Sequence, residues 1–139
     1  MTRSPGNKTK QSTVLIVEDA ETCASILEIV FSSIPGLNVV TASSGDQAWE
    51  LLENEPETIR AIVTDLHMPG MDGFELMERV RSHKAHAGVP IIVITGCTDP
   101  DAPEQARLRG ANAVFMKPYS PARLREKLEQ LLGNDTSCD

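Results

Sequence analysis

Aromatic side chains are scarce in this sequence, and long hydrophobic runs are missing from it. Aromatic residues make up 4% of the 139 residues, so a core has to be built mainly from Ile, Leu, Val and Met. No apolar stretch approaches the ~20 residues that a membrane-spanning helix needs. The polar N-terminus also lacks the apolar segment of a secretory signal. We therefore expect a soluble cytoplasmic protein that does not bind a membrane.

Cysteine and positive charge are sparse as well. The three cysteines, Cys23, Cys97 and Cys138, match neither a disulfide framework nor a metal-binding motif. A formal net charge of −7 argues against direct binding of nucleic acid. The exception is residues 107–127, the basic segment, which carries six basic side chains against one acid. It is either a solvated helix face or a docking face for an acidic partner.

Apolar runs and helical patterns alternate five times along the chain. Strands are predicted at 14–17, 38–42, 61–64, 91–94 and 113–116, and helices at 20–33, 44–53, 74–83, 101–109 and 120–133. Unbroken β-branched runs are typical of parallel strands that are covered on both faces. The pattern predicts an α/β protein, a doubly wound (βα)5 three-layer sandwich over residues 13–133. Gly133 is expected to end the last helix, with flexible tails at 1–12 and 134–139.

Polar residues directly follow four of the predicted strands. Glu18 and Asp19 follow the first, Asp65 the third, Thr95 the fourth and Lys117 the fifth. Ligands of open α/β sheets bind at this carboxyl edge. Three carboxylates there would repel one another unless a cation joined them, and Mg²⁺ prefers oxygen ligands. A lysine and a hydroxyl would complete a site for a phosphoryl group.

Each of these residues also has an ordinary structural explanation. The acidic pair could cap a helix, and Asp65 and Lys117 could belong to turns. Thr95 could simply end its strand. These explanations would have to hold together at four successive strand ends. A shared site is therefore the better interpretation.

The motifs around these residues resemble the receiver domains of two-component response regulators. The matching stretches are VLIVEDA at 14–20, AIVTDLHMPGMDGFEL at 61–76, IIVITG at 91–96 and GANAVFMKPY at 110–119. The resemblance extends from about Thr13 to Gly133. It implies a flavodoxin-like, five-stranded parallel sheet in the order 2-1-3-4-5.

The resemblance also implies a magnesium site. Asp19 and Asp65 would bind Mg²⁺ directly, and Glu18 would act mostly through water. The backbone carbonyl of His67 would be a further ligand. Mg²⁺ is the one cofactor that this family pattern predicts.

The function that the resemblance implies is that of a signalling switch rather than a metabolic enzyme. Asp65 would accept a phosphoryl group from a sensor histidine kinase or a histidine phosphotransfer protein, with Thr95 and Lys117 contacting that group. The protein would catalyse its own slow dephosphorylation. With no output domain, it would act as a monomer on a downstream protein through residues 96–127. The bond between Lys117 and Pro118 is expected to be cis.

Val114, His67 and Cys97 depart from the family pattern, and two alternative functions remain. Val114 stands where receivers usually carry an aromatic switch residue, so we expect the signal to travel through residues 95–101 instead. The chain could be a degenerate receiver that serves only as an interaction module. A flavodoxin-like cofactor binder is the weaker alternative, because residues 18–21 (Glu-Asp-Ala-Glu) are acidic where such a protein binds phosphate.

Overall fold

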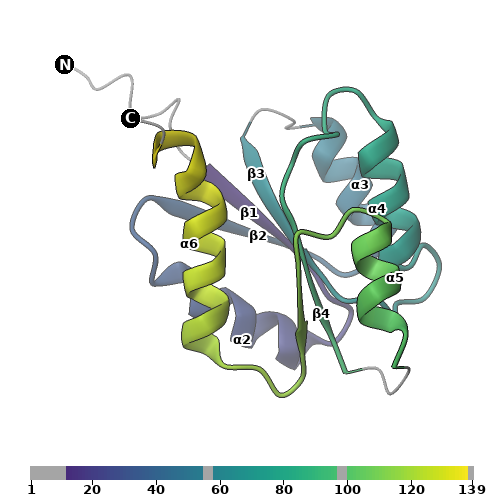
Figure 1. Ribbon diagram of the computed structural model, residues 1–139, viewed down its shortest axis with the longest axis horizontal. Coiled ribbons are helices and arrows are strands. Elements are labelled where there is room, and N and C mark those ends of the chain that lie inside the picture. The colour runs from purple at the N-terminus through teal and green to yellow at the C-terminus, as the bar shows by residue number, and fades with distance from the viewer. Residues whose placement is uncertain (1–11, 55–57, 97–99, 138–139) are drawn as a thin grey trace.

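The structure, a computed structural model, describes residues 12–54, 58–96 and 100–137 and contains one parallel sheet between two helical layers (Figure 1). The strands are β1 (Ser12–Val17), β2 (Leu37–Ala42), β3 (Ile59–Thr64), β4 (Ile91–Thr95) and β5 (Ala113–Met116). They lie in the order β2-β1-β3-β4-β5, and every neighbouring pair is parallel. The predicted fold and strand order are confirmed.

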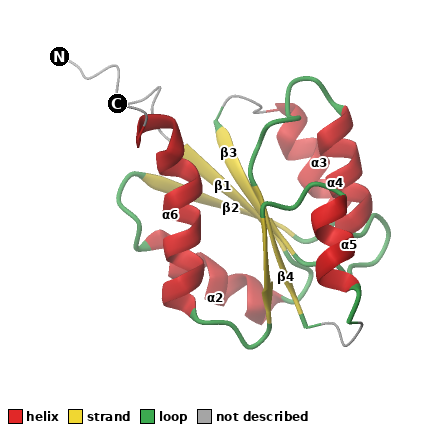
Figure 2. Ribbon diagram, viewed as in Figure 1, coloured by secondary structure: helices red, strands yellow, loops and turns green. Residues whose placement is uncertain are grey.

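The helices divide between the two faces of the sheet (Figure 2). They are α2 (Glu21–Ser32), α3 (Gly45–Asn54), α4 (Gly73–Ser82), α5 (Ala102–Leu108) and α6 (Pro121–Ser137). Side chains of β1 alternate between two cores: Val14 and Ile16 pack with α2 and α6, whereas Leu15 and Val17 pack with α3, α4 and α5. This alternation follows from the two-residue period of a strand. Because both faces of β1 pack in a core, polar groups that could bind a ligand lie at the ends of the strands.

Element boundaries differ from the sequence predictions where polar residues continue an element. β1 begins at Ser12, which pairs with Leu37, and β3 begins two residues before the predicted start. The prediction that the last helix ends at Gly133 is wrong, because α6 continues to Ser137. Gly133 has no positive φ, and a glycine inside a helix costs only about 1 kcal/mol relative to alanine.

Two further predictions concern the ends of the chain and the membrane. The predicted N-terminal tail, apart from Ser12, lies outside the described residues. Within the described ranges, no helix is both long and apolar enough to cross a membrane.

Candidate functional site

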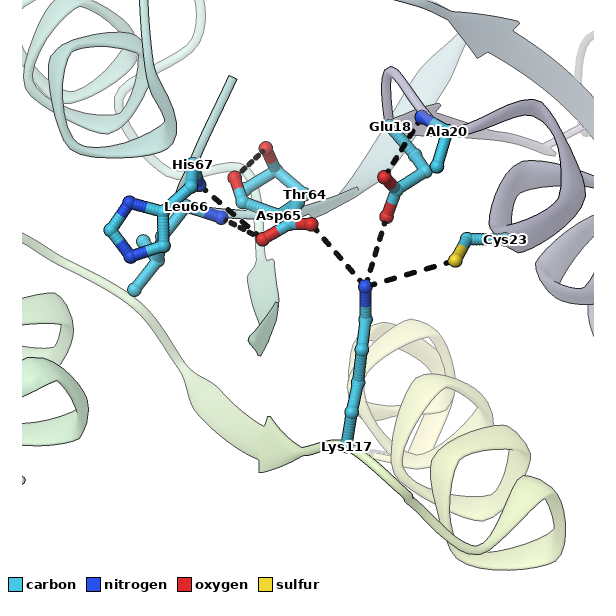
Figure 3. Close-up of polar contacts among 8 residues, drawn as sticks. All are labelled: Glu18, Ala20, Cys23, Thr64, Asp65, Leu66, His67 and Lys117. Atoms are coloured by element: carbon cyan, nitrogen blue, oxygen red, sulfur yellow. Dashed lines mark hydrogen bonds and ion pairs between the residues drawn. The ribbon is translucent and has the colours of Figure 1, made fainter. Parts of the chain in front are cut away.

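Three charged side chains from separate strand ends converge at the carboxyl edge of the sheet. Val17 of β1 and Thr64 of β3 are register partners, so Glu18 and Asp65 leave the sheet at the same level. The Asp65 amide donates a hydrogen bond of 3.0 Å to the Val17 carbonyl and fixes this alignment. Figure 3 shows the side chains of Glu18, Asp65 and Lys117 pointing toward one another. The sheet register therefore brings together residues that lie far apart in the sequence.

The ammonium of Lys117 lies between the two carboxylates. Its Nζ is 3.3 Å from Oδ2 of Asp65 and 3.4 Å from Oε1 of Glu18. The Glu18 side chain is 3% exposed and that of Asp65 12%, whereas Lys117 is 29% exposed. Because water screens these carboxylates poorly, the charges interact more strongly than they would on the surface. The position between them is therefore one that attracts a cation.

Burial and charge shift the proton affinities of this group. Burial raises the pKa of the Glu18 carboxyl above its ordinary value, and the nearby Asp65 charge adds to the effect. Burial alone would lower the pKa of the Lys117 ammonium, but Asp65 and Glu18 outweigh it and hold that pKa above its ordinary value. Both shifts have the direction expected for partly buried, interacting charges.

Backbone amides hold the oxygens that face away from Lys117. Oδ1 of Asp65 accepts hydrogen bonds from the amides of Leu66 at 2.6 Å and His67 at 3.3 Å. Oε2 of Glu18 accepts one from the amide of Ala20 at 3.1 Å. Each carboxylate thus has one oxygen fixed by the backbone and the other directed at the ammonium. The oxygens that face the Lys117 ammonium are Oδ2 of Asp65 and Oε1 of Glu18.

Thr95 and Lys117 adjoin through the backbone of β4 and β5. The Lys117 amide donates a hydrogen bond of 2.8 Å to the carbonyl of Thr95, whose side chain is fully buried. The Lys117–Pro118 peptide is cis, which confirms the prediction. Thr95 therefore belongs to the same corner of the sheet as the lysine.

Asp19 and His67 are both exposed, beside Glu18 and Asp65 respectively. Across the described part of the chain, no three acidic, histidine or cysteine side chains converge as a ready-made metal centre. The chemistry of the donor set nonetheless fits Mg²⁺, because Asp65 and Glu18 present carboxylate oxygens at one edge of the sheet and oxygen is the donor that Mg²⁺ prefers.

The sequence analysis did not assign Gly73 and Cys23 to the site. A Cβ on Gly73 would collide with the carbonyl oxygen of Asp65, so α4 can begin against the site only with glycine there. Cys23, in the first turn of α2, has its Sγ 3.9 Å from Nζ of Lys117. The only available signal for Cys23 was its place in a helix that begins directly after the acidic pair. The signal for Gly73 was its position at the end of the loop after Asp65.

Comparison with known proteins identifies the family. Residues 14–129 match the response regulator receiver domain family. The chain belongs to that family. This receiver is 34% identical over 120 residues to the chemotaxis protein CheY homolog of Campylobacter jejuni, covering 86% of this chain and 92% of the relative. It is 34% identical over 122 residues to chemotaxis protein CheY1 of Helicobacter pylori, covering 88% and 98%.

Solved structures agree with this assignment. A protein assigned as a response regulator from Chloroflexus aurantiacus superposes with a TM-score of 0.81 at 33% identity, over 88% of this receiver and 98% of that chain. Chemotaxis protein CheY4 of Vibrio cholerae gives a TM-score of 0.78 at 27% identity, over 88% and 99%. The protein is thus a CheY-like receiver domain of two-component signalling, a signalling protein rather than a classical enzyme.

The fifth strand of this receiver carries no aromatic ring on the face toward α5. Val114 packs against the core shared with α3, α4 and α5, and its register partner on β4 is Val93. Phe115 and Tyr119 both pack against the opposite core, with α2 and α6. Phe115 therefore cannot take the place of Val114 without a change of register, and Tyr119 lies beyond the end of the strand.

Proposed function

We propose that this receiver is a phosphorylatable switch that accepts a phosphoryl group on Asp65 in a magnesium-dependent reaction. The supporting observation is the placement of Oδ2 of Asp65 3.3 Å from the Lys117 ammonium. A phosphoryl group attached to that oxygen would lie beside a positive charge. Phosphoryl transfer depends mainly on such positioning and charge neutralisation.

The proposed step exchanges one bond for another. The bond between phosphorus and an imidazole nitrogen of the donor histidine breaks, and its electron pair stays on the imidazole, which takes up a proton. A bond forms between phosphorus and a carboxylate oxygen of Asp65, giving an acyl phosphate. The Leu66 and His67 amides hold Oδ1, so the carboxylate is oriented before the donor arrives. Lys117 and the Thr95 hydroxyl would contact the transferred oxygens.

Mg²⁺ would be held by Asp19, Asp65 and the His67 carbonyl, with Glu18 acting mostly through water. When bound, the ion neutralises charge on the phosphoryl oxygens. Burial raises the pKa of the Glu18 carboxyl, so a nearby cation favours its ionised form.

The proposed partners are proteins. A sensor histidine kinase or a histidine phosphotransfer protein would supply the phosphoryl group. A downstream target would bind residues 96–127, of which 97–99 lie outside the described residues. Arg107 and Arg123 are exposed on this surface, which favours an acidic target.

Acetyl phosphate with Mg²⁺ tests the acceptor assignment, because it supplies the phosphoryl group without any partner. Intact-mass measurement should show one added phosphoryl group on the wild type and none on Asp65→Asn. Asp46→Asn, an exposed change in the first turn of α3, is the matched control and should label like the wild type. Undiminished labelling of Asp65→Asn would show that the acceptor is another residue.

A receiver that serves only as an interaction module is the second candidate. Its supporting observation is that the Lys117 ammonium pairs with both Asp65 and Glu18, so the protein itself offsets part of their negative charge. Such a module would show no phosphoryl gain in the same assay, while still binding its target. Labelling of the wild type with saturable Mg²⁺ dependence would exclude this candidate.

A further inference from the structure

The Lys117 ammonium contacts three side-chain acceptors, and the third is a thiol. An ammonium carries three N–H donors. Oxygens of Asp65 and Glu18 lie 3.3 and 3.4 Å from Nζ, and Sγ of Cys23 lies 3.9 Å from it. Figure 3 shows Cys23 across the ammonium from Asp65. One acceptor is therefore available for each donor.

The element that carries Cys23 gives this contact a fixed position. Cys23 lies in the first turn of α2, a twelve-residue helix whose Leu27 and Phe31 are buried in the core. Its side chain is half-buried. Lysine, by contrast, has a long side chain with much rotamer freedom, which is costly to restrict. A sulfur on a packed helix can therefore restrain the ammonium.

We propose that Cys23 is a positioning residue for Lys117, an inference that rests on the proposed function. The thiol accepts the third N–H of the ammonium and keeps Nζ beside Oδ2 of Asp65. A thiol suits this role because it is a weak acceptor without a formal charge. It restrains the ammonium without competing with a phosphoryl group for the positive charge. A carboxylate at the same position would compete.

Two substitutions separate this role from simple packing. Cys23→Ser keeps an acceptor but is more polar, whereas Cys23→Val fills the space but has no acceptor. A packing role favours valine, and a positioning role favours serine. Thr22→Ala, an exposed change in the same turn, is the matched control. Thermal unfolding of all variants establishes that each one is folded.

The first readout is the rate of labelling by acetyl phosphate at saturating Mg²⁺. We expect Cys23→Val to be about three- to tenfold slower than the wild type, the range for losing one ordinary hydrogen bond, because sulfur is a weak acceptor. Cys23→Ser and Thr22→Ala should stay within about twofold. A wild-type rate in Cys23→Val, or equal rates in the serine and valine variants, would overturn the inference.

The second readout does not depend on phosphorylation. In metal-free protein labelled with ¹⁵N-lysine, a restrained ammonium should give a ¹H–¹⁵N signal that a freely solvated one loses to exchange. The signal assigned to Lys117, by its disappearance in Lys117→Arg, should persist in Cys23→Ser and weaken in Cys23→Val. An equal signal in both variants would refute the positioning role. If the variants show this difference in the Lys117 signal while the wild type never gains a phosphoryl group, the proposed function is wrong, but the contact between Cys23 and Lys117 is supported.

Discussion

Nζ of Lys117 lies 3.3 Å from Oδ2 of Asp65, where it neutralises the same carboxylate that is proposed to bind Mg²⁺. Before phosphorylation, the ammonium and an incoming Mg²⁺ ion would therefore compete for the same negative charge. After phosphoryl transfer they would act together, because the acyl phosphate carries enough negative charge for both. Lys117 would thus weaken Mg²⁺ binding but promote phosphoryl transfer.

Lys117→Met should therefore bind Mg²⁺ more tightly and accept phosphoryl groups more slowly. We expect affinity to rise about five- to thirtyfold, from the loss of one nearby positive charge. The labelling rate should fall at least about tenfold. Calorimetric Mg²⁺ titration and acetyl phosphate labelling measure the two effects. Lys127→Met, on α6, is the control for a general change in charge, and unchanged Mg²⁺ affinity in Lys117→Met would contradict the competition.

His86 is a buried histidine at the opposite end of α4 from the site. Its ring stacks on that of His83, with centroids 4.7 Å apart, and meets Trp49 edge-on at 5.6 Å. Burial lowers the pKa of His86 below its ordinary value, and His83 lowers it further, while Glu53 opposes both. Arg79 lies over the Trp49 ring, 5.2 Å from its centroid. The folded state therefore disfavours protonation of His86.

The stability of the protein should consequently fall with pH below about 6.5, the ordinary pKa of histidine. Above that value His86 is neutral in both states and contributes nothing. Below it, the unfolded state takes up the proton first, so the free energy of unfolding decreases until pH passes the folded-state pKa. Urea unfolding over this range should show a smaller decrease for His86→Phe than for the wild type. His67→Gln, at an exposed histidine, should behave like the wild type.

Trp49 should report the same titration but not the phosphorylation site. It is the single tryptophan of the chain, and it contacts His83 and His86 rather than the strand ends. Its fluorescence should be quenched when His86 is protonated, and should respond little to Mg²⁺ or phosphorylation. A strong, saturable Mg²⁺ quench would contradict this placement.

Arg81 ties the end of α4 to two loops at the far edge of the sheet. Its guanidinium donates hydrogen bonds to the carbonyls of Ala87 at 2.9 Å, Val89 at 2.6 Å and Gly110 at 2.6 Å, and to Oδ1 of Asn112 at 3.1 Å. Burial lowers the pKa of Arg81. Arg81→Leu should lower the free energy of unfolding by about 2–4 kcal/mol, because several acceptors lose their donors.

Arg79→Leu is the matched control for Arg81, since it lies on the exposed side of the same helix. This substitution should lower the free energy of unfolding by about 1 kcal/mol or less, the contribution of the Arg79 contact with the Trp49 ring. Denaturant unfolding of both variants provides the comparison. Equal costs would mean that the Arg81 hydrogen bonds contribute little.

The basic segment offers a narrower docking face than its sequence indicates. Lys117 lies in the site, and Arg109 pairs with Glu78 at 2.8 Å. Charge reversal at the exposed Arg107 and Arg123 should slow association with an acidic target about tenfold or more at low salt, with a smaller effect on dissociation. Surface-binding kinetics at two salt concentrations would measure this. Binding that survives both reversals at low salt would mean that the segment is only solvated.

Val114 should keep one rotamer in the free and activated forms. It is β-branched, with a stiff χ1, and it is partly buried against the core that includes α5. We expect activation to change residues 96–108 instead, of which 97–99 lie outside the described residues. NMR of the free protein and its beryllofluoride complex can compare the two regions. Rearrangement of β5 with residues 96–108 unchanged would contradict this route.

Local patterns in the sequence predicted the α/β class and the strand ends at which the candidate site residues lie, whereas the strand order came from the family resemblance. Buried parallel strands correspond to apolar runs in the sequence, and the first polar residue after each run lies at the carboxyl edge of the sheet. Glu18, Asp65, Thr95 and Lys117 could be placed there without coordinates, because strand periodicity and helix signals act over a few residues.

Tertiary structure alone decided how these residues face one another. Lys117 reaches Asp65 and Glu18 across 52 and 99 residues of sequence, and no local pattern encodes the rotamer that directs its ammonium between them. The Cys23 contact and the Arg81 hydrogen bonds likewise depend on packing between distant elements. At Gly133 the local signal was misleading: a glycine there predicted the end of the helix, but α6 continues past it to Ser137. Local propensities are worth about 1 kcal/mol or less per residue, so packing and long-range contacts decide wherever they oppose them.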